Sequence, residues 1–130
     1  MGEILLRTFL VAVGGAAGAV ARYLISGWVS RAFPASFFPW GTLTVNVTGS
    51  LLLGLLLGAT ISGRLGLSTE GRLLLAVCGL GAFTTFSTFA FETLEAGRAG
   101  DLRTALMNVS IGLIVGLLAC WIGLSAGERL

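Results

Sequence analysis

The chain has 130 residues, of which 55% are hydrophobic and 11% charged, and its mean hydropathy is +0.97. This composition excludes an ordinary soluble globular domain and indicates a protein embedded in a bilayer. The formal net charge of +2 comes from scattered arginines, so nothing indicates nucleic-acid binding. Histidine is absent, which removes the commonest proton shuttle and metal ligand and argues against an enzyme.

Four apolar segments follow one another along the chain, each close to or above the roughly 20 residues that a spanning helix needs. They cover Ile4–Val29, Trp40–Ile61, Arg72–Leu94 and Leu102–Leu124, and short loops rich in proline, glycine or charge connect them. We therefore predict an all-α, multi-pass integral membrane protein in which residues 1–130 form a single four-helix transmembrane domain.

Two features of these segments have simple interpretations. The apolar pattern of the first segment continues past Arg22 to about Trp28, too far for an ordinary signal peptide, so we expect it to be retained. Cys78 and Cys120 lie inside apolar runs, and we expect both to be reduced packing residues rather than a disulfide.

Loop arginines are nearly balanced between the two sides of the predicted bundle. The side with both termini carries Arg7, Arg64, Arg72 and Arg129, and the other side carries Arg31, Arg98 and Arg103. Because such residues normally fix orientation, near balance favours insertion in both directions and an antiparallel, dual-topology homodimer. The alternative is a single orientation set by other features. A bundle this small fills its own centre, so a solute path would lie between two copies.

Glycines four residues apart occur in three of the four spans. The pairs are Gly14 with Gly18, Gly54 with Gly58, and Gly112 with Gly116. Small residues at this spacing let helix backbones approach closely, so we expect each pair to lie at a helix contact.

The third span contains an unusual polar stretch, GLGAFTTFSTFAF, at 79–91. Its glycines lower the cost of leaving a helix, and its threonine hydroxyls can bond carbonyls that unwinding releases. We therefore expect the third helix to be broken mid-membrane, as helices at ion sites often are. The alternative is a continuous helix with hydroxyls bonded to its own backbone.

Two phenylalanines in this stretch are candidates for an ion path. Phe86 and Phe89 share a helix face, and Phe83 would continue the stripe. Such a stripe is usually a packing surface, but here Ser87 and Thr88 place hydroxyl donors beside rings whose edges carry positive potential. That combination suits a small anion.

The second span offers a matching donor in GTLTVNVTGS, at 41–50. Asn46 lies inside the span, with Thr42 one turn earlier as a further polar candidate for the path. A buried Asn must be hydrogen-bonded. It acts either as a clamp between helices or as an amide donor to a permeating anion.

Two charged residues lie within or near the spans. Arg22 is costly inside a bilayer and is therefore a functional candidate by default, either as an anion-attracting vestibule residue or as an interfacial anchor. Glu92 would repel anions in a pore, and we expect it to pair with an arginine.

Three motifs, GGAAGAVARY at 14–23, WGTLTVNVTGS at 40–50 and GLGAFTTFSTFAFE at 79–92, together resemble the CrcB family of fluoride channels, also called Fluc. The resemblance covers three of the four helices in order and spacing. It implies a passive, fluoride-selective channel in the bacterial inner membrane that protects the cell from fluoride, built as an antiparallel homodimer with two pores.

The same resemblance assigns residues. Phe86 and Phe89 would line each path with their ring edges, and Asn46 would supply an amide donor. The broken helix would hold a central, structural sodium ion through the backbone carbonyls of Gly81 and Thr84 from both subunits.

The chain departs from the family pattern in places. Ala82 stands where a second glycine is common, and Asn108 and Gly112 stand where the fourth helix often has Tyr and Ser. Two rivals remain. A small multidrug transporter would need a buried carboxylate in the first helix, which carries Arg22 instead, and a nonconducting assembly subunit would use Asn46 only as a clamp.

Overall fold

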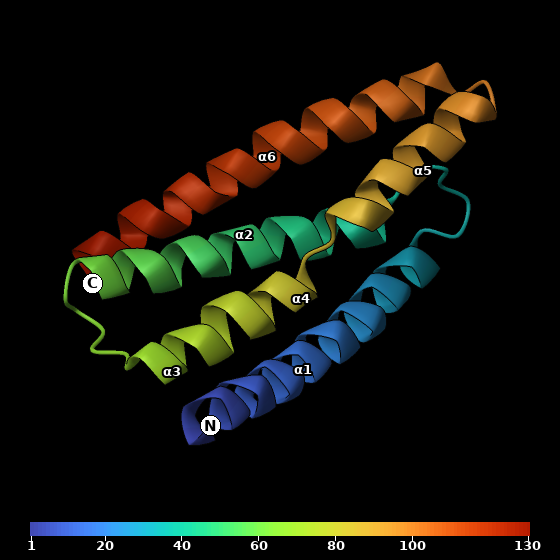
Figure 1. Cartoon of the computed structure of the whole chain (residues 1–130). Coiled ribbons are helices and arrows are strands. Elements are labelled where there is room, and N and C mark those ends of the chain that lie inside the picture. The colour runs from blue at the N-terminus through green and yellow to red at the C-terminus, as the bar shows by residue number, and fades with distance from the viewer.

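The computed structural model describes residues 1–130 and consists entirely of helices and their connections (Figure 1). Helices α1 (Gly2–Ala32), α2 (Trp40–Ile61) and α6 (Leu102–Arg129) are continuous, and Thr69–Arg98 forms the remaining long apolar segment. All four are long and apolar enough to cross a membrane, as the four predicted spans require. Most large apolar side chains face outward, as a bilayer environment requires.

The third span is assembled from several pieces. It begins with α3 (Thr69–Arg72), widens into the π-helix η1 (Leu73–Leu80), and continues through α4 (Gly81–Phe83) and α5 (Phe86–Arg98). The widened turn was not expected from the sequence.

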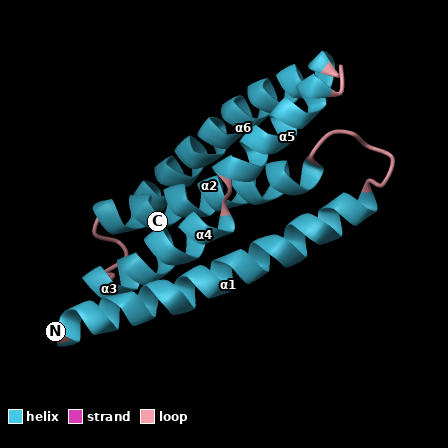
Figure 2. Cartoon of the chain, turned by 45° about the vertical axis from the view of Figure 1, so that its right-hand side comes forward, coloured by secondary structure: helices cyan, strands magenta, loops and turns pink.

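Both termini and the connection from α2 to α3 lie at one end of the bundle, and the other two connections lie at the opposite end (Figures 1 and 2). These ends are the two sides between which the loop arginines are divided. The chain therefore presents nearly equal numbers of loop arginines at its two ends.

Helices α2 and α6 approach each other through glycines. A Cβ atom at Gly54 would clash with the Cys120 carbonyl and lie 2.9 Å from Leu124 N, and Gly123 meets the backbone of α2 in the same way. Gly14 and Gly18 likewise face the third span. The predicted contact at Gly112 and Gly116 is different, because neither meets another backbone: Gly112 faces an aromatic ring and Gly116 faces open space.

We expect Gly54→Ala to lower the free energy of unfolding by about 1–3 kcal/mol, because the added methyl group has no room between α2 and α6. Gly15→Ala is the matched control, since a Cβ at Gly15 meets nothing within 4 Å and alanine favours the helix. Thermal unfolding in detergent, followed by circular dichroism, compares the two. Equal stability of both variants would contradict the close helix contact.

Candidate functional site

The third span is interrupted where the polar stretch predicts it. Helix α4 ends at Phe83, and α5 begins at Phe86. Between them the backbone is extended, with φ −81° and ψ 161° at Thr84 and φ −150° and ψ 111° at Thr85. The Thr85 hydroxyl caps α5 by accepting a hydrogen bond of 3.2 Å from the backbone N–H of Thr88.

Asn46 of α2 holds this interruption in place. Its Oδ1 accepts a hydrogen bond of 2.7 Å from the backbone N–H of Thr85, and its Nδ2 donates a bond of 3.1 Å to the Thr85 carbonyl. The side-chain amide thus takes the place of the helical partners of both backbone groups of Thr85. Asn46 is a clamp between helices, and one hydrogen of its NH₂ group is left over for another acceptor.

The interruption changes the hydrogen bonding of two backbone carbonyls, those of Gly81 and Thr84. In a continuous helix the Gly81 carbonyl would accept from Thr85 N, and the Thr84 carbonyl from Thr88 N. Thr85 N bonds to Asn46 and Thr88 N to the Thr85 hydroxyl. The Gly81 carbonyl keeps only a 3.4 Å bond from the Thr84 hydroxyl. Both carbonyls therefore lie at a helix end without their usual donors.

A cleft of about 360 Å³ borders the interruption, and we call it the uncharged cleft because no Asp, Glu, Lys or Arg lines it. Its lining comes from α2, the break, α5 and α6: Leu43, Asn46, Ser50, Leu53, Thr84, Thr85, Phe86, Phe89, Asn108, Gly112, Leu113, Gly116, Leu117 and Cys120. The structure thus brings Asn46, Phe86 and Phe89 together, although they come from separate helices.

Phe86 and Phe89 lie beside each other at the uncharged cleft. Their ring centroids are 5.7 Å apart with an interplanar angle of 41°, so the two rings are tilted relative to each other rather than stacked. Phe86 is 76% exposed, whereas Phe83 is 8% exposed. Phe83 does not continue their stripe, because the extended residues between α4 and α5 break the helical register.

Ser87 and Thr88 lie in the first turn of α5 but do not line the uncharged cleft. The Thr85 hydroxyl donates to Thr88 Oγ1 over 2.9 Å and lies 3.4 Å from Ser87 Oγ. Both side chains are exposed on the surface of the single chain. The hydroxyl groups of Ser87 and Thr88 therefore lie next to the Thr85 hydroxyl that caps α5.

Thr42 of α2 and Glu92 of α5 form a pair one to two helical turns from the interruption, on the side of the connection between α1 and α2. The buried Thr42 hydroxyl donates to Glu92 Oε1 over 2.8 Å, while Glu92 Oε2 is buried without a partner. The expectation that Glu92 pairs with an arginine is wrong, since the one ion pair in the chain joins Arg7 to Glu3. Arginines of the third and fourth spans lie beyond its reach, and a hydroxyl on α2 takes their place.

Glu92 also lines a second cleft, of about 470 Å³, next to the connection between α1 and α2. Glu95 and Asp101 are its other carboxylates, and aromatic side chains such as Trp40 complete its wall. Hydrogen bonds from Thr104 hold the pKa of Asp101 below its ordinary value. The stabilisation from this helix cap is therefore present at neutral pH and is lost as the pH falls through the lowered pKa.

Arg22 lies on α1, away from the uncharged cleft, and is partly exposed. It forms no ion pair and no side-chain hydrogen bond. The single chain thus does not bring Arg22 to Asn46, Phe86 or Phe89.

The comparisons with known proteins agree with one another. The family model described as "CrcB-like protein, Camphor Resistance (CrcB)" matches residues 9–124. A protein of Symbiobacterium thermophilum called "Fluoride-specific ion channel FluC 1" is 49% identical over 91% of this chain and 94% of its own length. Proteins called "Fluoride-specific ion channel FluC" from Acidobacterium capsulatum and Thermus thermophilus are 42% and 44% identical, over 92% and 95% of this chain and 94% and 95% of their own lengths.

Proposed function

The chain belongs to the CrcB family, whose relatives are fluoride-specific ion channels called FluC, and from this membership we propose how it conducts fluoride. It is a multi-pass membrane channel of this kind and not an enzyme. The proposed path runs through the uncharged cleft beside the broken third helix, and transport is passive.

The observation that carries the proposal is the lining of the uncharged cleft. It combines two aromatic rings, an amide and backbone groups with no charged side chain. A strongly hydrated anion must exchange water for donors when it enters. Ring edges of Phe86 and Phe89 offer weak positive potential, and the remaining N–H of Asn46 offers a hydrogen bond. None of these groups carries a charge that would trap the ion.

Other polar groups fit subsidiary positions on the route. Ser87 and Thr88 are proposed polar contacts next to the cleft, and Thr42 a contact at the end where it bonds to Glu92. Arg22 is proposed as a vestibule residue that attracts anions from one side of the membrane, because a charge in this position lacks an internal partner.

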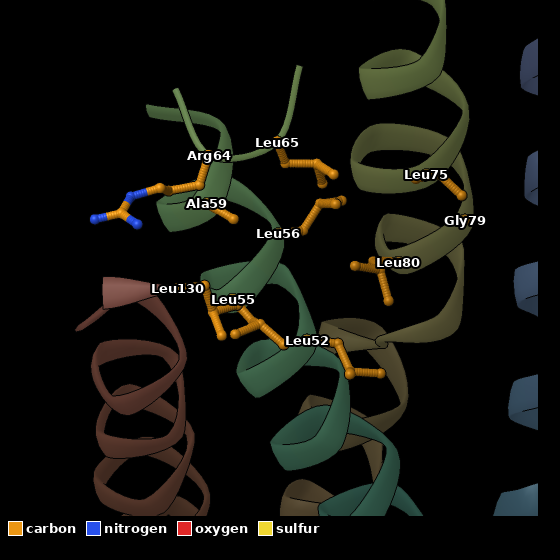
Figure 3. A pocket seen from close by; sticks show the side chains of 10 residues that line it. All are labelled: Leu52, Leu55, Leu56, Ala59, Arg64, Leu65, Leu75, Gly79, Leu80 and Leu130. Carbon is orange, nitrogen blue, oxygen red and sulfur yellow. The ribbon is translucent and has the colours of Figure 1, made fainter. Parts of the chain in front are cut away.

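The proposed functional unit is an antiparallel homodimer with two pores. Phe86 is 76% exposed, so one wall of the path is open in the single chain. A separate apolar cleft of about 610 Å³ lies between α2 and η1, where leucine side chains from both helices project into the gap (Figure 3). A second copy would cover both surfaces, and near-equal loop arginines allow the two copies to insert in opposite directions.

We expect tags at both termini to be accessible from each side of the membrane, because a dual-topology population presents both ends on both sides. Labelling of a terminal cysteine with a membrane-impermeant reagent, in a variant lacking Cys78 and Cys120, measures this in cells and in inverted vesicles. Labelling from one side alone would reject the antiparallel arrangement but would not contradict the assignment as a fluoride channel.

The interruption also suits a structural sodium ion at the dimer centre. The carbonyls of Gly81 and Thr84 have lost their helical donors, and carbonyl oxygens are suitable ligands for a hard cation. Two carbonyls from each copy would complete the set. A sodium ion held by these carbonyls would supply positive charge at the helix break. Asn46 keeps the Gly81 carbonyl free of its helical donor by binding Thr85 N–H, and the Thr85 hydroxyl does the same for the Thr84 carbonyl by binding Thr88 N–H.

In the cell, the proposed role is fluoride export across the bacterial inner membrane, which protects against fluoride toxicity. Expression in a bacterial strain lacking its own fluoride channel should restore growth in fluoride-containing medium. Membrane-inserted protein that fails to restore growth would reject this role. A multidrug transporter would instead protect against cationic drugs. A nonconducting subunit would protect against neither fluoride nor cationic drugs.

A further inference from the structure

Asn108 of α6 ties the backbone of Phe89 to the fourth helix. Its side chain is 2% exposed, and its Nδ2 donates to Thr93 Oγ1 over 2.8 Å and to the Phe89 carbonyl over 3.5 Å. The Thr93 hydroxyl itself donates to the Phe89 carbonyl over 2.7 Å. The Phe89 carbonyl therefore receives two side-chain bonds, one from Thr93 of the same helix and one from Asn108 of α6, which also donates to Thr93.

Gly112 lies one helical turn beyond Asn108 and faces the ring of the same phenylalanine. A Cβ at Gly112 would lie 3.0 Å from Phe89 Cε2, 3.6 Å from Cδ2 and 3.8 Å from Cζ. A methyl group there would force the ring to move. Gly116, one turn further along, lines the same cleft, but a Cβ there meets nothing within 4 Å.

From these contacts we infer that Asn108 and Gly112 are positioning residues that fix where the Phe89 ring lies in the uncharged cleft. Asn108 acts through Thr93 on the backbone of α5, and Gly112 leaves the space that the ring occupies. The inference rests on the proposed function, because it holds that α6 fixes the position of the Phe89 ring, which the fluoride ion is proposed to contact.

The orientation of the ring matters because an aromatic ring is electrostatically two-sided. Its edge attracts an anion and its face repels one. A displaced or rotated Phe89 would therefore weaken the contact on which the path depends, even though the ring is still present. Gly112 has no side chain of its own to offer the path, so it contributes through the position of Phe89.

The position of the ring can be measured without any transport. Phe89 is replaced by 4-fluorophenylalanine in the full-length protein, and its ¹⁹F resonance is recorded in fluoride-free detergent solution. We expect Gly112→Ala to shift this resonance and to slow fluoride efflux about tenfold, equivalent to about 1.4 kcal/mol. Gly116→Ala, whose added methyl group meets nothing within 4 Å, should leave the resonance in place. Similar behaviour of the two variants would overturn the inference.

A second pair of variants tests the Asn108 relay independently and avoids the risk that Gly112→Ala fails to assemble. Thr93→Val keeps the shape of the side chain but removes the hydroxyl, whereas Thr93→Ser keeps the hydroxyl. We expect Thr93→Val to shift the Phe89 resonance and slow efflux, and Thr93→Ser to restore both. Equal effects of Val and Ser would overturn the relay. An absence of fluoride efflux from the unmodified protein would instead reject the proposed function, and the resonance would still report the ring position.

Discussion

Asn46→Asp is expected to reduce fluoride efflux by roughly a hundredfold or more, equivalent to about 2.7 kcal/mol at the barrier. Aspartate retains an acceptor for Thr85 N–H but has no N–H to donate, so a carboxylate oxygen would face the Thr85 carbonyl across the present 3.1 Å contact. The substitution also introduces a negative charge into a cleft that has none, where it repels the permeating anion.

The measurement is fluoride efflux from vesicles at neutral pH, with dimer assembly checked by size-exclusion chromatography. Thr48→Ala serves as the control, because Thr48 lies on the same helix, is exposed, bonds only to the backbone of that helix and does not line the uncharged cleft. Undiminished efflux from a correctly assembled Asn46→Asp dimer would remove Asn46 from the ion path and leave it as a clamp alone.

Phe86→Ile and Phe89→Ile are each expected to slow fluoride efflux by about tenfold or more while dimer assembly stays near normal. Isoleucine keeps an apolar side chain but loses the polarised ring edge that the anion would contact. Phe86 is 76% exposed in the single chain, so its replacement removes little packing within that chain.

Phe91→Ile is the matched control for both substitutions. Phe91 lies on the same helix and is 63% exposed, but it does not line the uncharged cleft. Its replacement should leave efflux within about twofold of the unmodified protein. If Phe86→Ile and Phe89→Ile behave like Phe91→Ile, the rings are packing residues and the path lies elsewhere.

The elements that follow from local composition were predictable. Four apolar segments and three polar loops determine the spans, because bilayer thickness sets the length of each. The predicted positions of the helix ends were less accurate. Helix α6 continues to Arg129, beyond the expected end at Leu124, because a helix can extend past the apolar stretch into the headgroup region. The break was also predictable, because glycine and threonine alter backbone preferences locally.

What depends on contacts between distant residues was not predictable. Asn46 bonds to a residue 39 positions later, and no local pattern indicates that its amide replaces the helical partners of Thr85. The same holds for Glu92, whose partner is a hydroxyl on α2 rather than the expected arginine. The widened turn of η1 lies in an ordinary apolar run, LLLAVCGL, whose composition does not distinguish a π-helix from an α-helix.

The contribution of the fourth helix was also hidden from the sequence. Gly112 and Gly116 form a regular small-residue pair, which usually indicates helix contact. Only the fold shows that their surroundings differ, because Phe89 lies against Gly112 and nothing lies against Gly116. The glycines that do contact α2 are Gly123 and Gly127, which lie further along α6.

The most direct test of a passive fluoride channel is fluoride release from proteoliposomes that contain the purified protein, followed with a fluoride-selective electrode and without a proton gradient. We predict rapid fluoride release well above that of protein-free vesicles, with chloride retained under the same conditions. Fluoride retained in vesicles that contain the correctly folded protein, or released only when a proton gradient is imposed, would contradict a passive fluoride channel.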